Sequence, residues 1–317
     1  MRAVFLDYDT VSNGDLDRSV FTRAMAAVEY FGTTEPAQIG ERIGDAEIVL
    51  LNKVKLARGQ LQEAPKLKLI AVAGTGTDNV DLVAARERGI AVCNVRGYCT
   101  QSVVQHAWSM ILSLTQHLPQ FSRLTMDGSW VKSEASTLFA HPIRELAGCT
   151  LGVVGWGDLG RGVAKIAGAF GMQVIIANRP GGVAEPGRVD LEQLLETADV
   201  VSLHCPLTPA TRGLIGAHEL ALMKPGALLI NTARGALVDG FALARALKDR
   251  RLAGAGIDAL TQEPPVDGDP LLDPDIPNLI VTPHIAWAAR EARQRCLAEM
   301  AANIEDFSRG GRRGRVM

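Results

Sequence analysis

Three side chains that can do proton and carboxylate chemistry lie in motifs that each follow the end of an apolar run. Arg234 stands in INTARG, Glu263 in GIDALTQEP and His284 in VTPH. Each run has the length and composition of a buried β-strand. In an open parallel sheet the carboxyl ends of the strands meet at one edge, where ligands bind. A lone histidine, arginine or glutamate is usually structural or solvated, but packing does not require all three at one edge.

This combination of side chains fits the reduction of a carbonyl group by a hydride. Negative charge develops on the carbonyl oxygen as the hydride arrives, and a nearby acid must neutralise it. His284 is the predicted acid, and Glu263 is the carboxylate that orients its ring and stabilises the protonated form. Arg234 presents a planar fork of donors that suits a carboxylate or a polarised carbonyl. Together the three residues predict a 2-oxo acid reductase.

The source of the hydride is predicted from residues 149–171, CTLGVVGWGDLGRGVAKIAGAFG. The strand Leu151–Val154 leads into Gly155, Gly157 and Gly160, which have the G-x-G-x-x-G spacing, and helical periodicity follows. The first glycine permits a tight turn, the second lets a pyrophosphate approach the backbone, and the third allows helix and strand to pack closely. Backbone N–H groups and the positive end of the helix dipole then face the anion. We therefore predict a dinucleotide site.

A second apolar strand, Gln173–Ala177, favours this site over an ordinary strand-to-helix turn. It ends at Asn178 and Arg179, about twenty residues after the glycines, where dinucleotide folds place the side chain that reads the ribose. An aspartate there accepts hydrogen bonds from the ribose 2'-hydroxyl and repels a 2'-phosphate, whereas Asn178 does not repel it. Arg179 can reach the phosphate with a charge-assisted hydrogen bond. The sequence therefore predicts NAD(H) or NADP(H) as the cofactor and favours NADP(H), although Asn178 can also bond a ribose hydroxyl of NADH.

Composition and charge argue against several classes of function. The chain has 317 residues, of which 47% are hydrophobic and 21% charged, as expected for a soluble enzyme of about two domains. Its net charge of -2 offers no basic field for a nucleic acid or an anionic membrane. Neither a signal peptide nor a membrane span is expected. Five cysteines without a C-x-x-C pair predict a reducing, cytoplasmic environment, and the histidines lack the spacing of metal ligands.

The alternation of short apolar runs with helical segments predicts an α/β protein with two doubly wound parallel sheets. The strands expected in the first domain are Ala3–Leu6, Glu47–Leu51 and Leu69–Ala73. The strands expected in the second domain are Leu151–Val154, Gln173–Ala177, Val200–Leu203, Ala227–Asn231, Gly254–Asp258 and Leu279–Thr282.

Four segments lie outside this alternation. Thr100–Leu118 has helical spacing, and Trp287–Phe307 is a last helix with no strand after it, so we expect it to cross back to the first domain. Pro119–Ala147 shows no clear strand and is typical of an arm that packs on a second subunit. Val20–Phe31 fits either a helix or a strand.

Six motifs make the chain resemble the D-isomer-specific 2-hydroxyacid dehydrogenases over nearly its whole length. They are AGTGTDNVDL, VVGWGDLGR, HCPLTPATRGLI, MKPGALLINTARGALVD, GIDALTQEPP and TPHIAW. The resemblance implies a Rossmann-type NAD(P)-binding domain of residues 101–285, inserted in a smaller flavodoxin-like substrate domain of residues 1–100 and 286–317. It also implies an arm at about residues 119–147 and a homodimer joined through it.

The resemblance assigns roles to individual residues, motif by motif. It makes Arg234, Glu263 and His284 the catalytic set. The cofactor contacts that it implies are Val104, Gly155, Gly157, Asp158, Leu159, Gly160, Asn178, Arg179, Cys205, Pro206, Thr211, Thr232, Ala233, Arg234, Asp258, His284 and Ala286. The substrate contacts that it implies are Lys53, Thr75, Gly76, Arg234 and His284, with Thr75 and Gly76 offering backbone N–H groups to the substrate carboxylate.

Within the family, two features resemble the glycerate dehydrogenase or hydroxypyruvate reductase branch. They are the Asn52–Lys53 pair and the HIAWA sequence that ends at Ala288. This branch implies the interconversion of hydroxypyruvate or glyoxylate with the D-2-hydroxy acid. Many NAD-using members carry Asp where this chain has Asn178. Two other functions stay open: a dinucleotide-sensing corepressor on the same fold, and a phosphoglycerate dehydrogenase that lacks a regulatory domain.

Overall fold

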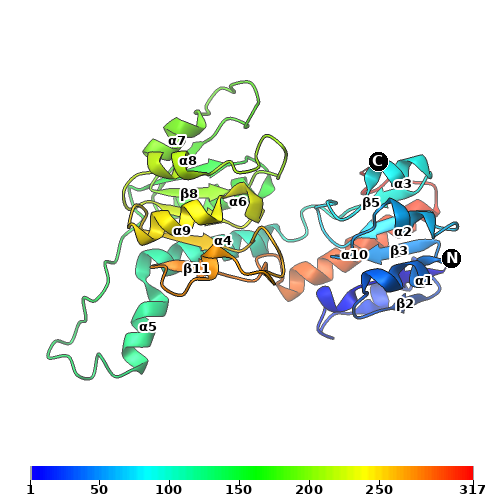
Figure 1. The fold of residues 1–317 in the computed structure, drawn as a ribbon, viewed down its shortest axis with the longest axis horizontal. Coiled ribbons are helices and arrows are strands. Elements are labelled where there is room, and N and C mark those ends of the chain that lie inside the picture. The colour runs from blue at the N-terminus through cyan, green and yellow to red at the C-terminus, as the bar shows by residue number, and fades with distance from the viewer. Residues whose placement is uncertain (1, 317) are drawn as a thin grey trace. The chain divides into compact units, whose positions relative to one another are not determined.

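The computed structural model of the protein describes residues 2–316, which form two compact units (Figure 1). The first unit takes in the chain up to Cys99 and again from Trp287. The second unit is Thr100–Ala286. Each unit has its own parallel sheet with helices on both faces.

The first unit contains a five-stranded parallel sheet with the order β2-β1-β3-β4-β5. Its strands are β1 (Ala3–Phe5), β2 (Val28–Tyr30), β3 (Ile48–Leu51), β4 (Leu69–Val72) and β5 (Ala91–Cys93). Every residue of β1, β3, β4 and β5 is buried, as expected for strands covered on both faces. The order reverses between β1 and β3, and open α/β sheets bind ligands at such a switch point.

Helices bury alternate residues of these strands on the two faces of the sheet. The helices on one face are α1 (Ile39–Ile43), α2 (Arg58–Gln62) and α3 (Leu82–Glu87). On the other face, α10 (Arg290–Ser308) inserts Leu297, Met300 and Ile304 among residues of β1 and β3. Short 3₁₀ turns cover Tyr8–Thr10, Arg18–Phe21 and Pro36–Gln38. The segment 20–31, which fitted either a helix or a strand, therefore forms the end of a 3₁₀ turn and then β2.

The second unit contains a six-stranded parallel sheet with the order β11-β10-β9-β8-β6-β7. Its strands are β6 (Thr150–Val154), β7 (Gln173–Ile176), β8 (Val200–Leu203), β9 (Leu228–Asn231), β10 (Gly254–Ile257) and β11 (Leu279–Val281). All six had been predicted from the sequence, and each bound agrees within one residue. The order reverses between β6 and β8, so the glycine turn after β6 lies at the switch point of this sheet.

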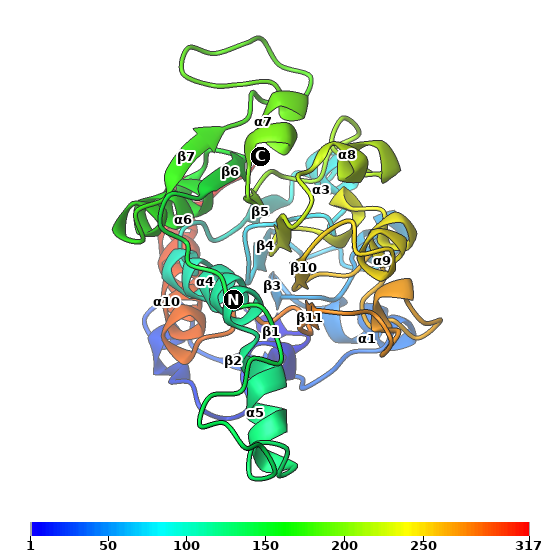
Figure 2. The same cartoon turned by 90° about the vertical axis from the view of Figure 1, so that its left-hand side faces the viewer.

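Helices cover both faces of the second sheet as well (Figure 2). One face carries α4 (Thr100–Gln116) and α6 (Asp158–Ala169), and the other carries α7 (Leu191–Thr197), α8 (Ala217–Leu222) and α9 (Gly240–Lys248). Helix α4 packs closely on α6, because Gly162 leaves room for Val104: a Cβ at Gly162 would lie 2.6 Å from Val104 Cγ2. Short 3₁₀ turns cover Gly235–Leu237 and Pro270–Leu272.

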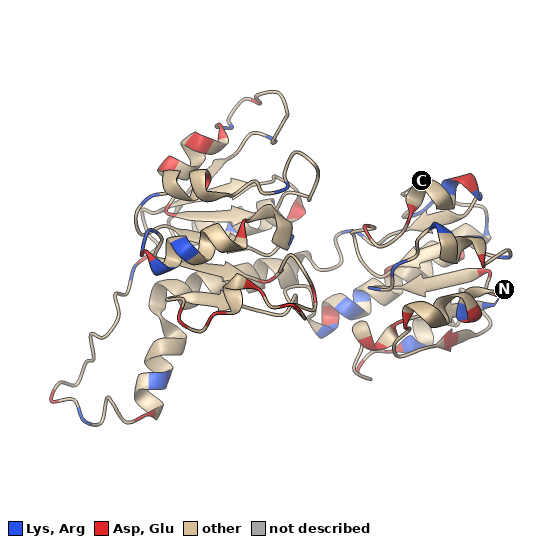
Figure 3. Cartoon of the chain, viewed as in Figure 1, with Lys and Arg blue, Asp and Glu red and all other residues tan. Residues whose placement is uncertain are grey.

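An arm of residues 118–147 extends from the second unit (Figure 1). It begins with helix α5 (Leu118–Met126), where the sequence had predicted irregular structure, and residues 127–147 contain no further helix or strand. His117 has a left-handed backbone, with φ 49°, and so interrupts the helical path between α4 and α5. The arm exposes apolar side chains among scattered charged residues, whose positions along the backbone are coloured in Figure 3. These exposed apolar residues are Leu118, Met126, Trp130, Val131, Phe139 and Ile143.

No helix among residues 2–316 has the length and apolar character needed to cross a membrane. All five cysteines are free thiols, and four of them are buried.

A pair of histidines lies where the arm joins α4. The ring of His117 stacks on that of His141 with 5.2 Å between centroids, and within residues 2–316 His117 Nδ1 has no hydrogen-bond partner. Burial lowers the pKa of His117, and the nearby His141 lowers it further. The folded arm therefore favours the neutral ring.

We expect the arm to loosen as the pH falls below 6.5, the ordinary pKa of histidine. Below that pH the opened segment binds a proton that the folded segment resists, so acid favours opening. Hydrogen exchange of residues 117–147 at about pH 7.5 and about pH 5.5, corrected for intrinsic rates, measures the effect. His117→Asn, which tolerates a left-handed backbone, should remove the difference, whereas His218→Asn at an exposed position should keep it. Equal protection of the parent at both pH values would contradict the prediction.

Candidate active site

The turn between β6 and α6 has the shape that an anion-binding loop needs. Gly155 has a φ of 105°, and a Cβ there would lie 2.5 Å from the backbone N of Cys205 at the end of the neighbouring strand. A Cβ at Gly160 would lie 2.1 Å from Gly155 O, whereas a Cβ at Gly157 would have no neighbour within 4 Å. Glycine is thus required at the first and third positions, and the second leaves the backbone approachable just where α6 begins.

Two buried polar atoms at the same edge of the sheet lack protein partners. Among residues 2–316, neither Thr232 Oγ1, after β9, nor His204 Nδ1, after β8, has a hydrogen-bond partner. Burial lowers the pKa of His204 to about 4 and raises the pKa of Cys205 to about 11, so both side chains are neutral. Buried polar atoms are normally satisfied. A dinucleotide along this edge would supply partners, and the residues present therefore fit one.

Glu263 and His284 form a close pair beyond β10 and β11. Glu263 Oε2 lies 2.6 Å from His284 Nδ1, and Oε1 accepts a hydrogen bond from Leu260 N at 3.0 Å. An ionised carboxylate can only accept, so Nδ1 of the ring carries the hydrogen. Nε2 is then the ring atom that can take up or release a second proton. The side chain of His284 is 26% exposed and that of Glu263 is 33% exposed, so solvent reaches the pair.

Asn231, the last residue of β9, braces the turn that carries Arg234. Its Oδ1 accepts a hydrogen bond from Ala233 N at 3.0 Å, and its Nδ2 donates to Arg234 O at 2.9 Å. Asn231 is fully buried, and Arg234 Nη1 donates to Ala233 O at 2.9 Å. Asn231 was not among the predicted site residues, because its pattern indicated only the end of a strand. Its position before the turn in INTARG is the signal that was available.

The buried carboxylate of Asp258 holds the turn that carries His284. Asp258 is 1% exposed and accepts hydrogen bonds from Ile285 N at 2.8 Å, Ala286 N at 2.9 Å and Thr282 Oγ1 at 2.6 Å. Its backbone O accepts from His284 N at 2.8 Å. These bonds stabilise a left-handed backbone at His284, with φ 55°, which is uncommon outside glycine.

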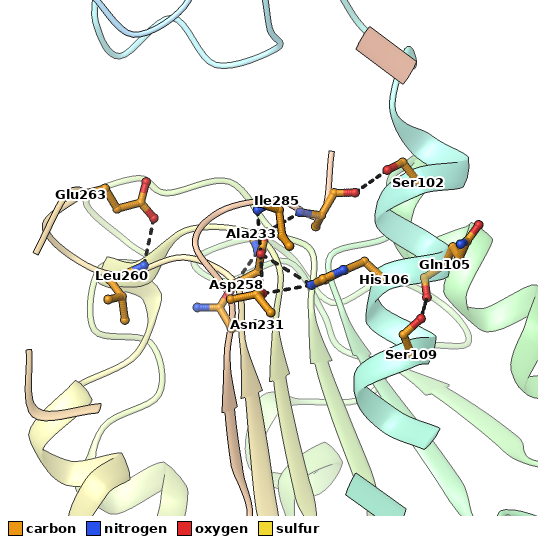
Figure 4. Close-up of polar contacts among 12 residues, drawn as sticks. Ser102, Gln105, His106, Ser109, Asn231, Ala233, Asp258, Leu260, Glu263 and Ile285 are labelled. Atoms are coloured by element: carbon orange, nitrogen blue, oxygen red, sulfur yellow. Dashed lines mark hydrogen bonds and ion pairs between the residues drawn. The ribbon is translucent and has the colours of Figure 1, made fainter. Parts of the chain in front are cut away.

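Helix α4 also contacts this turn, through Ser102 and His106, which were not among the predicted site residues (Figure 4). His106 Nε2 lies 3.0 Å from Thr282 Oγ1 and 3.6 Å from Asp258 Oδ1. Ser102 Oγ donates to Ala286 O at 2.6 Å. The sequence shows only that Ser102 and His106 share one face of a helix. Their partners are more than 170 residues away and could not be identified from it.

The strand end expected to read the ribose is tied into the following loop. Asn178 Nδ2 donates to Asp190 Oδ1 at 2.9 Å, and Asn178 Oδ1 accepts from Glu185 N at 3.0 Å. Arg188 pairs with Glu185 at 2.8 Å. Arg179 is exposed, and the described part of the chain offers its guanidinium no ion-pair partner.

In the first unit, the backbone around Lys53 is organised by a second buried carboxylate. Asp7, just beyond β1, is 2% exposed and accepts hydrogen bonds from the backbone N–H groups of Asn52, Lys53 and Val54, just beyond β3. Lys53 therefore lies at the switch point of this sheet, where a ligand site is expected.

The turn that carries Thr75 and Gly76 follows β4 of the same sheet. Thr75 Oγ1 donates to Val95 O at 2.7 Å, and Thr75 O accepts from Asn94 Nδ2 at 2.7 Å. The hydroxyl and the carbonyl of Thr75 are thus used to hold the turn, which is consistent with an expected role for its backbone N–H.

The other predicted cofactor contacts occupy the same edge or the helices behind it. Thr211 Oγ1 donates to Pro206 O at 2.7 Å and shapes the loop after β8. Asp158, the first residue of α6, pairs with Arg161 at 2.8 Å, and Val104 is buried against α6. Among residues 2–316 no group of three or more His, Cys, Asp or Glu side chains is placed to hold a metal ion.

The parallel sheet with a glycine turn after β6 is typical of dinucleotide-dependent oxidoreductases, and sequence comparison identifies the family. The chain matches the sequence model of the D-isomer specific 2-hydroxyacid dehydrogenase, NAD binding domain, over residues 108–286, more than half of its length. The protein belongs to the D-isomer-specific 2-hydroxyacid dehydrogenases. The predicted family, the predicted enzyme class and the predicted NAD-binding domain are therefore confirmed.

Individual relatives are similar over nearly the whole chain. It is 45% identical to the glycerate dehydrogenase of Methylorubrum extorquens, over 98% of this chain and 96% of that protein. It is 35% identical to the hydroxypyruvate reductase of Blautia hydrogenotrophica, over 98% of each chain. A crystal structure of a protein from Thermus thermophilus matches with a TM-score of 0.87 at 36% identity, over 100% of both chains. The predicted fold class, two parallel-sheet α/β domains, is confirmed.

Proposed function

We propose that the protein uses a nicotinamide dinucleotide to interconvert small 2-oxo acids and D-2-hydroxy acids, and that hydroxypyruvate and glyoxylate are its substrates. The names of the two enzyme relatives support hydroxypyruvate as a substrate, and glyoxylate is the smaller 2-oxo acid that the resemblance to the same branch implied. The observation that carries the proposal is the 2.6 Å pair of Glu263 and His284, which lies on the same sheet edge as Arg234 and the glycine turn.

In this proposal the residues of the second unit divide the work of carbonyl reduction. A bound nicotinamide supplies the hydride. Arg234 binds the substrate carboxylate or the polarised carbonyl with its planar fork. Nε2 of His284 delivers a proton to the carbonyl oxygen as the hydride reaches the carbon, so the carbonyl becomes a CH–OH group. Glu263 stabilises the cationic ring before the proton leaves, and in the oxidation direction the same nitrogen accepts the proton.

The cofactor is proposed to lie along the edge from β6 to β11. Gly155, Gly157 and the start of α6 at Asp158, Leu159 and Gly160 would take the pyrophosphate, where the helix dipole favours an anion. Cys205, Pro206 and Thr211 would line the adenosine side, and Thr232, Ala233, Asp258 and Ala286 the nicotinamide side. Lys53 and the backbone N–H groups of Thr75 and Gly76 are proposed to bind the substrate.

Replacing Arg234 with Lys should abolish most activity while the protein stays folded. Lysine keeps the charge but loses the bidentate geometry, so we expect kcat/KM to fall about a hundredfold or more. The assay follows the oxidation of NADH and NADPH with glyoxylate, hydroxypyruvate and pyruvate. Arg245→Lys, at an exposed position of α9, is the matched control. Near-normal turnover by the Arg234 variant would remove Arg234 from the site.

We propose that the enzyme favours NADP(H), with Arg179 as the residue that contacts the 2'-phosphate. Arg179 is exposed, and the described chain contains no ion-pair partner that would compete with a phosphate. Asn178 carries no charge, and its amide group is engaged with Glu185 and Asp190. An aspartate at position 178 would face the Asp190 carboxylate at hydrogen-bonding distance and disturb the loop. Arg179 is therefore the cleaner position at which to test cofactor choice.

The variant Arg179→Ala should lower kcat/KM for NADPH by roughly ten- to a hundredfold, because a charge-assisted hydrogen bond of about 1.5 to 3 kcal/mol is lost. The value for NADH should change little. Arg188→Ala, which removes the arginine that pairs with Glu185 in the same loop, should leave the ratio of the two cofactors unchanged. If the parent prefers NADH tenfold, or if Arg179→Ala leaves the ratio where it was, this residue does not select the cofactor.

We also propose that two copies form a homodimer through the arm, in a reducing cytoplasm. Several large apolar side chains of the arm are exposed, among them Val131 and Phe139, which are 86% and 89% exposed, and burial against a second copy would remove them from water. The free thiols are in keeping with a reducing compartment.

Light scattering should give the parent about twice the chain mass of 33.8 kDa. The double variant Val131→Asp with Phe139→Asp should be monomeric, because four buried carboxylates would oppose the assembled interface. Val183→Asp, at an equally exposed position outside the arm, should stay dimeric. A monomeric parent would rule out the dimer, and a dimeric double variant would place its interface elsewhere.

A further inference from the structure

Helix α4 contacts the His284 turn at two points that are one helical turn apart. Ser102 and His106 have the i, i+4 spacing, so their side chains project from one face of the helix. Ser102 Oγ donates to Ala286 O at 2.6 Å, and His106 Nε2 lies 3.0 Å from Thr282 Oγ1 (Figure 4). The two contacts lie on opposite sides of His284 in the sequence. Helix α4 therefore holds both ends of the short segment that carries the proposed acid.

The positions of the hydrogens in this cluster follow from the donors available. Asp258 is buried and accepts two backbone N–H groups, as an ionised carboxylate does. The only hydrogen on the Thr282 hydroxyl must then point to Asp258 Oδ1, 2.6 Å away. Thr282 Oγ1 can only accept from the other side, so His106 Nε2 must carry a hydrogen. The contacts run in one direction, from His106 through Thr282 to Asp258.

We propose that His106 is a positioning residue of the reaction and that it acts through Thr282 and Asp258. A donor on His106 polarises the Thr282 hydroxyl and strengthens its bond to the buried carboxylate. That carboxylate fixes the N–H groups of Ile285 and Ala286, while Asp258 O binds His284 N. Without the His106 donor, the bond from Thr282 to the Asp258 carboxylate is weaker, and the left-handed turn at His284 is held less firmly. The effect on catalysis rests on the proposed function, whereas the hydrogen-bond direction does not.

The kinetic test is a double-mutant cycle between His106 and Thr282. We expect His106→Ala and Thr282→Val each to lower kcat by roughly ten- to a hundredfold, because a displaced acid loses its alignment with the carbonyl oxygen. The double variant should be no slower than the slower single variant, since both break one chain of contacts. KM for the 2-oxo acid should change by no more than about threefold, because substrate binding is assigned to other residues.

Conservative and matched variants separate positioning from packing. The amide of Gln places an N–H donor near the position of His Nε2, so His106→Gln should recover most of kcat. Ser109→Ala removes a hydroxyl from the next part of the same helix, where it bonds only Gln105 O among the contacts shown in Figure 4, and should leave kcat unchanged. Thermal unfolding of each variant identifies losses that are due to instability. Additive single effects, or a Gln variant as slow as the Ala variant, would overturn the proposal.

A second measurement does not depend on activity. In ¹⁵N-histidine NMR of the protein without substrate, His106 should give the signature of a hydrogen on Nε2, and the signal assigned to it should vanish in His106→Gln. In Thr282→Val that signal should shift, because its acceptor is gone. A neutral His106 with its hydrogen on Nδ1 alone would overturn the inferred direction. If the parent reduces no 2-oxo acid but shows the Nε2 signature, the proposed function fails while the hydrogen-bond chain stands.

Discussion

Burying the Asp258 carboxylate in the second unit requires compensating donors, because an unpaired charge in the interior costs several kcal/mol. Its hydrogen-bond donors are the two N–H groups that follow His284 and the hydroxyl of Thr282, just before it. The same turn therefore satisfies the charge and carries the proposed acid, so neither can change without the other. Asp7 plays the same part in the first unit, where its buried carboxylate holds three consecutive N–H groups around Lys53. In each unit a strand-end carboxylate organises the neighbouring loop.

Parallel sheet topology explains why these loops occur where they do. All strands of a sheet point one way, so their carboxyl ends share one edge, and the loops leaving it diverge where the strand order reverses. In the second unit that divergence lies between β6 and β8, and the absence of a Cβ at Gly155 lets the two strand ends approach closely. The glycine turn, the buried hydroxyl of Thr232 and the pair of Glu263 and His284 are placed along this edge. The sheet and its helices pack regularly behind this edge, so the loops at the edge can carry different side chains without changing the core.

Two segments of the second unit lie outside its sheet and depend little on its core. The loop after β7 is held by the amide of Asn178, which bonds both Glu185 and Asp190, and it leaves Arg179 exposed. The arm begins at the left-handed residue His117 and presents apolar side chains that its own unit does not cover. Both depend on a few side-chain contacts more than on a core, so they can vary without disturbing the sheet.

The sequence by itself determined the strands of the second unit and the glycine turn, and it supplied Arg234, Glu263 and His284 as the proposed catalytic set, because these depend on local periodicity and on motifs of a few residues. The tertiary structure decided what depends on distant partners. Helix α5 and strand β2 had weak local signals, and β2 exists because β1 pairs with it. The hydrogen bonds of Asn231 to the turn that carries Arg234 were not predicted, because Asn231 fitted the pattern as the last residue of a strand. The partners of His106 and Ser102 lie 176 and 184 residues away, and only the folded chain brings them to the turn that carries His284. Hydrogen bonds over such separations leave no periodic trace in the sequence.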